Sequence, residues 1–278
     1  MPEPSLYQIC HGAQTHPEAD AGFTLLDTAA GERPDWGSYG PIRRFLLGAQ
    51  LDQESYYGFF PANFRQITGL NATAVRSLIE QQGGAADVIS FSPFFDQMAL
   101  YLNIVEQAVG NVPAGREAIR ACAALVAPEF RPDQDVTTSL DTIFRNCIVA
   151  RPAFWAEWLQ HCDLLFGHAE DPNTSLARTL RGADGAQAAQ LKAVAIEQVA
   201  SLVLWSQPQW VVSAGNAVRL PLSRAPIAAL VGMPDFIVLD SLKIAYVRSG
   251  AEQYLGIFQQ LRNKIVARHA ASRAPRHG

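Results

Sequence analysis

The chain has 278 residues, of which 49% are hydrophobic, and its formal net charge is −4. This length and apolar content can bury a sizeable core, in one large domain or in a domain with a helical extension. The slightly acidic balance gives no electrostatic reason to expect nucleic-acid binding. No basic and apolar leader begins the sequence, and no apolar run reaches the ~18 residues that span a bilayer, so we expect a cytoplasmic protein.

The first half of the chain predicts three apolar strands separated by loops and helices. The strands are LYQIC at 6–10, YYGFFPANF at 56–64 and DVISFSP at 87–93. The near-continuous apolarity of the third strand favours burial on both faces, as in a parallel or mixed sheet. Helices are predicted at 41–50 after Pro41, at 71–82 with Asn71 as the cap, and over 96–110.

The second half of the chain is mostly helical, with β-like segments at 142–152 and 210–214. Helices are predicted at 115–126, 153–167, 187–205 and from 235 onward, and the polar residues 170–186 predict a surface loop. The alternation predicts an α/β domain over 1–215, with a mixed, mostly parallel sheet flanked by helices. A helical C-terminal annex with a basic tail would follow over 216–278.

Several motifs that identify enzyme classes are absent from the sequence. There is no GxGxxG, P-loop, GxSxG, HExxH or zinc-type Cys/His cluster, which disfavours nucleotide hydrolases, Rossmann dehydrogenases and zinc hydrolases. Cys10, Cys122, Cys147 and Cys162 have apolar flanks and no metal-ligand spacing. We expect them to be small buried hydrophobes in a reducing compartment.

Polar side chains stand at the ends of the predicted strands. His11 follows the first strand, Ser92 and Asp96 end the third, and Asn146 precedes the β-like run IVA. If these ends meet at one edge of the sheet, they form the crevice where α/β proteins bind small molecules. Two roles stay open for Asp96: holding a metal or a ribose hydroxyl, or capping the helix that follows it.

Two helices carry further candidates. Trp155 and Trp158 lie three residues apart on one helix, where they either anchor the core or stack on a sugar. Glu197 interrupts an apolar helix face, so its carboxylate either faces solvent or is buried. If it is buried, its pKa rises toward the range of a general base.

Four segments resemble bacterial cell-surface polysaccharide and lipopolysaccharide biosynthesis proteins, which are similar to GT-A-type glycosyltransferases. They are RPDWGSYGPIRRFL, YYGFFPANFRQITGL, DVISFSPFFDQMALYLNIVEQ and NCIVARPAFWAEWL, and the resemblance spans most of residues 7–255. It implies a GT-A-like fold and transfer of a sugar from a nucleotide-sugar donor to a glycan or lipid-linked acceptor. We then expect donor contacts from Tyr7, His11, Tyr57, Ser92 and Asp96, acceptor contacts from Asn146 and Trp155, and a catalytic base at Glu197 or Asp141.

The cofactor and partner predictions follow from what this pattern lacks. No DxD motif stands at the strand end around Ser92 and Asp96, so we expect a metal-independent mechanism in which Arg or Lys offsets the leaving-group charge, with Mg²⁺ or Mn²⁺ as the alternative cofactor. The same absence leaves open a non-catalytic glycan-assembly partner that retains the fold. The acid-free stretch 262–278 predicts either a solvated terminus or peripheral contact with anionic lipids of the inner membrane.

Overall fold

The fold is organised around one six-stranded sheet with the strand order β2-β1-β3-β5-β4-β6. This computed structural model describes residues 2–10, 20–27, 33–82, 84–183, 185–215 and 217–273. β5 runs antiparallel to β3 and β4, its two neighbours, and the other strand pairs are parallel. The prediction of a mixed, mostly parallel sheet is therefore confirmed. The strands are β1 (Ser5–Cys10), β2 (Thr24–Asp27), β3 (Tyr57–Pro61), β4 (Val88–Ser90), β5 (Ile148–Ala150) and β6 (Val212–Ala214).

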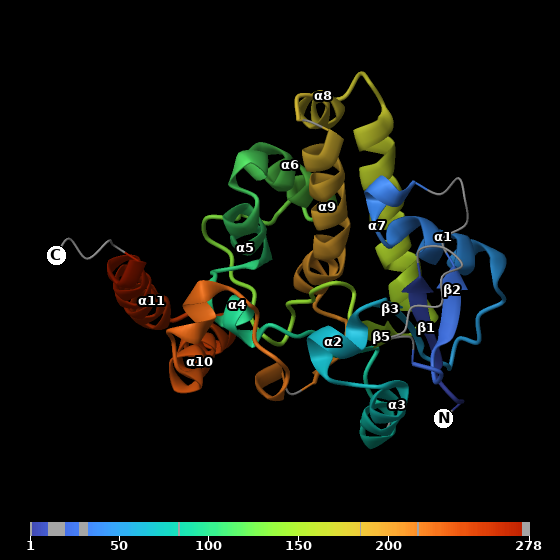
Figure 1. The fold of residues 1–278 in the computed structure, drawn as a ribbon, viewed down its shortest axis with the longest axis horizontal. Helices are drawn as coiled ribbons and strands as arrows, with labels where there is room; N and C mark the ends of the chain where they lie inside the picture. The colour runs from blue at the N-terminus through green and yellow to red at the C-terminus, as the bar shows by residue number, and fades with distance from the viewer. Residues whose placement is uncertain are drawn as a thin grey trace.

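Helices cover both faces of this sheet (Figure 1). The larger layer supplies side chains to one apolar core and consists of α1 (Tyr39–Gly48), α5 (Ile104–Asn111), α6 (Arg116–Val126), α7 (Pro152–Glu170), α8 (Ser175–Arg181) and α9 (Gly185–Ser206). The smaller layer, α2 (Phe64–Thr68) and α3 (Ala72–Gln81), packs in a second core. Short 3-10 turns lie at Pro34–Trp36, Pro113–Gly115, Ala217–Arg219 and Pro226–Ala229.

Alternation along the strands explains why the sheet is buried on both sides. In β3, Phe59 belongs to the larger core and Phe60 to the smaller one. In β5, Ile148 and Val149 divide in the same way. Successive side chains of a strand point to opposite faces, so each strand needs apolar residues at every position. The near-continuous apolar runs in the sequence are therefore explained.

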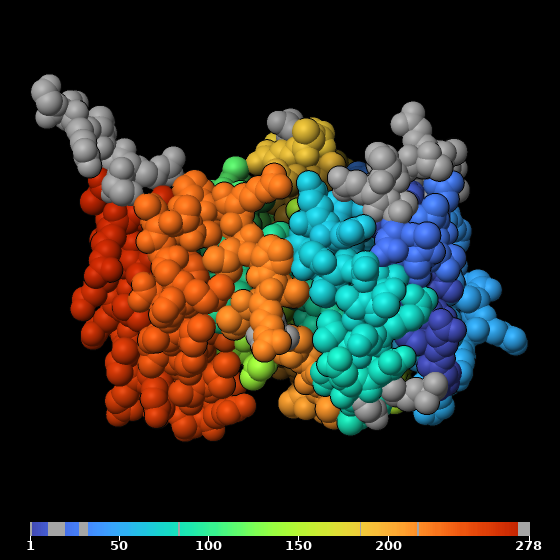
Figure 2. Space-filling model, turned by 60° about the horizontal axis from the view of Figure 1, so that its bottom comes forward, coloured from blue at the N-terminus to red at the C-terminus, as the bar shows by residue number. Residues whose placement is uncertain are grey.

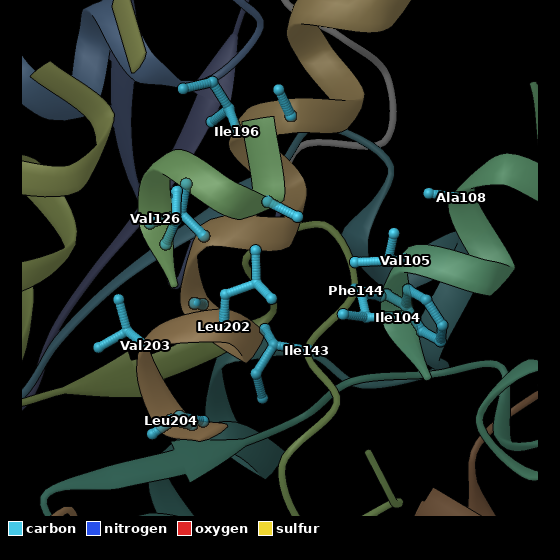
Figure 3. Packing of buried hydrophobic residues seen from close by; sticks show 14 of the residues in the cluster. Ile104, Val105, Ala108, Val126, Ile143, Phe144, Ile196, Leu202, Val203 and Leu204 are labelled. Carbon is cyan, nitrogen blue, oxygen red and sulfur yellow. The ribbon is translucent and has the colours of Figure 1, made fainter. Parts of the chain in front are cut away.

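The larger core is built mainly by α9 against the loops and helices beside it. Figure 3 shows Leu202 of α9 close to Ile143, and Ile104 next to Phe144. All four of these residues are at most 7% exposed. The loop before β5 and the start of α5 are therefore fixed in place by the same apolar packing.

Two predicted elements differ from the structure. The helix expected over 96–110 is two helices, α4 (Phe95–Leu100) and α5, because Tyr101 is extended and Asn103 caps α5 by accepting from the Glu106 N–H at 2.9 Å. The surface loop expected over 170–186 contains α8, which Thr174 caps. Asn71 caps α3 as predicted, since its side chain accepts from the Ala74 N–H.

The C-terminal helices extend to one side of the sheet domain (Figure 1). α10 (Met233–Ser249) packs on α4, and α11 (Glu252–Arg273) packs on α10. The predicted helical tail is confirmed, while the boundary between residues 215 and 216 stays a prediction. In the part of the chain that the structure describes, no helix combines the length and apolarity needed to cross a membrane.

Candidate functional site

A hollow lies at the edge of the sheet where β1 and β3 end. Its volume is about 230 Å³, and its lining includes Ile9 of β1, Phe59 of β3 and Ser38 before α1. Arg145, just before β5, and Glu197 of α9 complete it. We call this the sheet-edge hollow. It occupies the carboxyl edge of a mostly parallel sheet, the usual place for ligands in such folds.

A second hollow adjoins the first at these same two residues. Its volume is about 280 Å³. Its lining includes Arg145 and Glu197, four residues with side-chain amides, and Phe94, Phe144, Ser223 and Arg224. The amides belong to Gln97, Gln107, Asn111 and Gln198, so we call it the amide hollow. Each hollow is smaller than the roughly 300–1,000 Å³ of pockets for drug-sized ligands, but the two together fall within that range.

Arg145 and Glu197 form an ion pair on the boundary between the two hollows. Nη1 of Arg145 lies 3.9 Å from Oε1 of Glu197, and the side chains are 48% and 36% exposed. Burial raises the pKa of Glu197, an effect that Arg145 partly offsets. The site thus places a cation and a carboxylate of raised proton affinity side by side, both within reach of solvent.

A strained turn aims Arg145 into this position. Arg145 and Asn146 have φ values of +55° and +50°, in the left-handed region that non-glycine residues seldom adopt. The turn is closed by the Cys147 N–H, which donates to the Phe144 carbonyl at 3.1 Å. Asparagine tolerates this conformation and arginine does so poorly. Backbone strain of this kind is concentrated at functional sites.

Asn146 supports the sheet-edge hollow from behind. Its side chain is fully buried, and its Nδ2 donates to Oγ of Ser38 at 3.1 Å. Its Oδ1 is buried and has no hydrogen-bond partner in the described part of the chain. The predicted placement of Asn146 at a strand end beside the site therefore agrees with the structure, although its acceptor-binding role stays a prediction.

Asp96 organises a loop that borders the amide hollow. It is fully buried and accepts from the Ser223 N–H at 2.7 Å, from the Ser223 hydroxyl and from the Gln97 side chain at 2.8 Å. Ser223 and Gln97 line the hollow, whereas Asp96 lies behind them. Of the two roles left open for Asp96, capping of the following helix is wrong, because Asp96 lies inside α4, whose cap position is Phe94.

Three other predicted residues have their polar atoms engaged within the fold, and a fourth packs by its ring. The Trp155 indole donates to the Tyr57 carbonyl at 2.9 Å, and the ring is fully buried, as expected for a core anchor. The Tyr57 hydroxyl accepts from the Asp52 N–H, and Oγ of Ser92 accepts from the Phe144 N–H. Tyr7 stacks on Phe59 with ring centroids 5.5 Å apart. None of the four lines the two hollows.

Of the two remaining predicted residues, Asp141 is separate from this site. Asp141 accepts from the backbone and hydroxyl of Thr138, and burial raises its pKa to about 6. Its charged neighbour is Lys243, and it lines neither hollow. His11 lies outside the described residues.

Sequence reasoning missed Arg145 and Gln198. Arg145 directly precedes the predicted Asn146, and an arginine beside an asparagine before an apolar strand is a signal that could have been read. Gln198 gives no such signal, because only the packing around α9 shows that its amide is enclosed.

The donor set of these hollows does not fit a divalent cation held by protein ligands. Among the residues that line the two hollows, Glu197 is the one carboxylate. In the described ranges, no three His, Cys, Asp or Glu side chains gather in a way that could hold a metal ion.

A third and wider cleft lies where β4 and β6 end. It measures about 1,010 Å³ and is lined by residues of α2–α3 and of the segment 214–221. In Figure 2 the C-terminal segment in orange faces the cyan α2–α3 segment across a groove. No charged pair comparable to Arg145 and Glu197 is among its lining residues.

Comparison with known proteins leaves the site to be judged on its own geometry. No protein-family model, no curated protein and no solved structure matches this chain.

Proposed function

We propose that this protein is a glycosyltransferase with a GT-A-like fold, which moves a sugar from a nucleotide-sugar donor to a glycan or lipid-linked acceptor. The observation that carries the proposal is the Arg145–Glu197 pair on the boundary of two adjoining hollows at the carboxyl edge of the sheet. The resemblance seen in the sequence supports the same reaction class. The mixed, mostly parallel sheet is the architecture that this resemblance implies.

The pair supplies the two charges that such a transfer needs. A nucleoside diphosphate leaves with negative charge, which the Arg145 guanidinium would offset in the absence of a protein-held cation. An acceptor hydroxyl must lose its proton as it attacks, and the Glu197 carboxylate would accept that proton. Because burial raises the pKa of Glu197, it is a stronger base than an exposed glutamate.

The proposed step balances as a single displacement. The acceptor oxygen forms a bond to the anomeric carbon, while the bond between that carbon and the diphosphate oxygen breaks. The electron pair leaves with the diphosphate, and the hydroxyl proton moves to Glu197. Donor and acceptor would lie on either side of the pair, in the sheet-edge hollow and the amide hollow respectively.

Isothermal titration with UDP-, GDP-, CMP- and dTDP-sugars, with and without Mn²⁺, tests donor binding. We expect one nucleotide class to bind to the wild type and to bind at least tenfold more weakly to Arg145→Met. That variant keeps much of the side-chain length and removes the charge. Arg44→Met, on the exposed surface of α1, is the matched control. Failure of every donor to bind would refute the proposal.

The Glu197→Gln variant distinguishes the enzyme function from that of a non-catalytic assembly partner. In cells lacking the wild-type chain, the variant should fail to restore surface polysaccharide while still binding the donor. A general base contributes roughly 10²–10⁴-fold to a rate, so the loss should be clear. Full restoration by Glu197→Gln, combined with no restoration by an empty vector, would instead support the partner function.

A further inference from the structure

The amide of Gln198 has no partner although it is enclosed. Gln198 is 2% exposed, and neither its Oε1 nor its Nε2 has a hydrogen-bond partner among the residues that the structure describes. It lies two residues after Ile196 and directly before Val199, both of which are buried in the larger core. An apolar side chain would cost nothing at such a helix position, whereas an unsatisfied amide is costly.

The position of this amide connects it to a cavity. Gln198 lines the amide hollow together with its neighbour Glu197 and with Gln107 and Asn111 of α5. A ligand in the hollow can therefore supply the partner that the described residues do not. Each amide has an acceptor oxygen and a donor NH₂, so the group as a whole suits a ligand whose polar atoms both donate and accept.

We propose that the amide hollow binds a saccharide, with Gln198 as a specificity-determining contact. Sugar hydroxyls both donate and accept hydrogen bonds, which is the property that clustered amides match. The rings of Phe94 and Phe144, 6.2 Å apart, add apolar surface to the lining, as the carbon face of a sugar ring requires. That this saccharide is the acceptor rests on the proposed function, since Glu197 borders the same hollow.

The strain at Phe94 is a further sign that this wall is held in a defined shape. Phe94 has a φ of +69°, unusual for an aromatic residue, and its N–H donates to the Pro221 carbonyl at 3.1 Å. Asp96 then fixes Ser223 from behind, as described above. The wall is therefore fixed by buried hydrogen bonds before any ligand arrives, which lowers the entropic cost of binding.

Gln198→Met tests the proposal, because methionine has nearly the shape of glutamine without its amide. We expect the melting temperature to rise by about 2–5 °C, since an unsatisfied buried group is removed. Gln190→Met, at an exposed position of the same helix, is the matched control and should change neither stability nor binding. A fall in melting temperature, or failure to fold, would show that the amide serves the fold and would overturn the proposal.

Saturation-transfer difference NMR measures binding directly, with the methyl glycosides of glucose, galactose, mannose, rhamnose and N-acetylglucosamine as probes. At least one should give a signal with the wild type and with Gln190→Met, and that signal should be lost with Gln198→Met. A signal that survives in Gln198→Met, or the absence of any signal with the wild type, refutes the proposal. Displacement of the glycoside by free uridine or guanosine would assign the hollow to the donor base instead.

The two proposals fail in different ways. If nucleotide sugars bind but no glycoside does, the saccharide assignment is wrong and the transferase proposal stands. If a glycoside binds through Gln198 but no nucleotide sugar does, the hollow is a saccharide site on a protein that is not a nucleotide-sugar transferase. Donor titration of Gln198→Met completes the test, and its affinity should stay within twofold of the wild type.

Discussion

Replacing Lys243 by methionine tests how the C-terminal helices are fastened to the sheet domain. Lys243 is fully buried in α10, and its Nζ donates to the carbonyls of Met98, Tyr101 and Thr137 at 2.6, 2.8 and 2.7 Å. Methionine fills similar space but donates nothing. The variant therefore leaves three buried carbonyls without this donor.

The expected loss can be worked out from two opposing effects. Three carbonyls at about 2 kcal/mol each give a cost of roughly 6 kcal/mol. Burial lowers the pKa of Lys243 to about 8 from 10.5, so charging it in the fold costs about 3 kcal/mol, which the variant avoids. The net expectation is a loss of about 3 kcal/mol in the free energy of unfolding at pH 7.

Urea unfolding, followed by tryptophan fluorescence and by circular dichroism, measures this loss. All five tryptophans lie within residues 36–210, outside the C-terminal helices, so coincident curves would also show that α10 and α11 unfold with the rest. Lys264→Met, exposed on α11, is the control. A loss below 1 kcal/mol for Lys243→Met would refute the reasoning.

Three further predictions concern charge and backbone strain. If Glu197 is the base, the turnover rate should rise with pH, and the midpoint of the rise should lie above the ordinary pKa of glutamate because burial raises the pKa of Glu197. Glu197→Gln should remove this pH dependence. An unchanged pH profile in the variant would contradict the role of Glu197 as the base. Arg145→Gly removes the strain of a non-glycine residue at a φ of +55°. In urea unfolding, this variant should be as stable as the wild type or up to about 1 kcal/mol more stable, whereas Arg145→Ala should show no gain in stability. Burial raises the pKa of Asp141 to about 6, so between about pH 4 and 6 the folded state binds this proton more tightly than the unfolded state does. The contribution of Asp141 to the free energy of unfolding therefore falls as the pH rises through that range. The free energy of unfolding of Asp141→Asn should therefore exceed that of the wild type at pH 7.5, by up to about 3 kcal/mol, and the difference should be smaller at pH 4.5. If the variant is less stable than the wild type at pH 7.5, this prediction is wrong.

The sheet could be predicted from the sequence because its strands are buried on both faces. A run such as YGFFP must be apolar at every position, and few other local structures demand this. β2 was missed for the opposite reason. It is a four-residue edge strand whose side chains are mostly exposed, so tertiary pairing with β1, and not its own pattern, makes it a strand.

Polar residues at strand ends could be located from the sequence, but their partners could not. Asp96, Ser92 and Asn146 all lie at the carboxyl edge of the sheet or just behind it, as expected. Asp96 bonds Ser223, 127 residues away in the chain, and Ser92 bonds the Phe144 N–H, 52 residues away. Such long-range pairing leaves no local signal, so sequence reasoning cannot separate residues that hold the walls from residues that face the ligand.

The difference between these two groups lies in hydrogen-bond satisfaction. A buried polar side chain whose donors and acceptors are matched inside the fold, such as Asp96, stabilises the native state by itself. Within the described ranges, neither polar atom of the Gln198 side chain has a hydrogen-bond partner, nor has Oδ1 of Asn146, so both side chains cost stability in the free protein. Both stand beside the Arg145–Glu197 pair, where the backbone is also strained. Backbone strain and unsatisfied side chains thus lower the free energy of unfolding at this edge of the sheet, and under the proposed function a bound ligand would recover part of that loss.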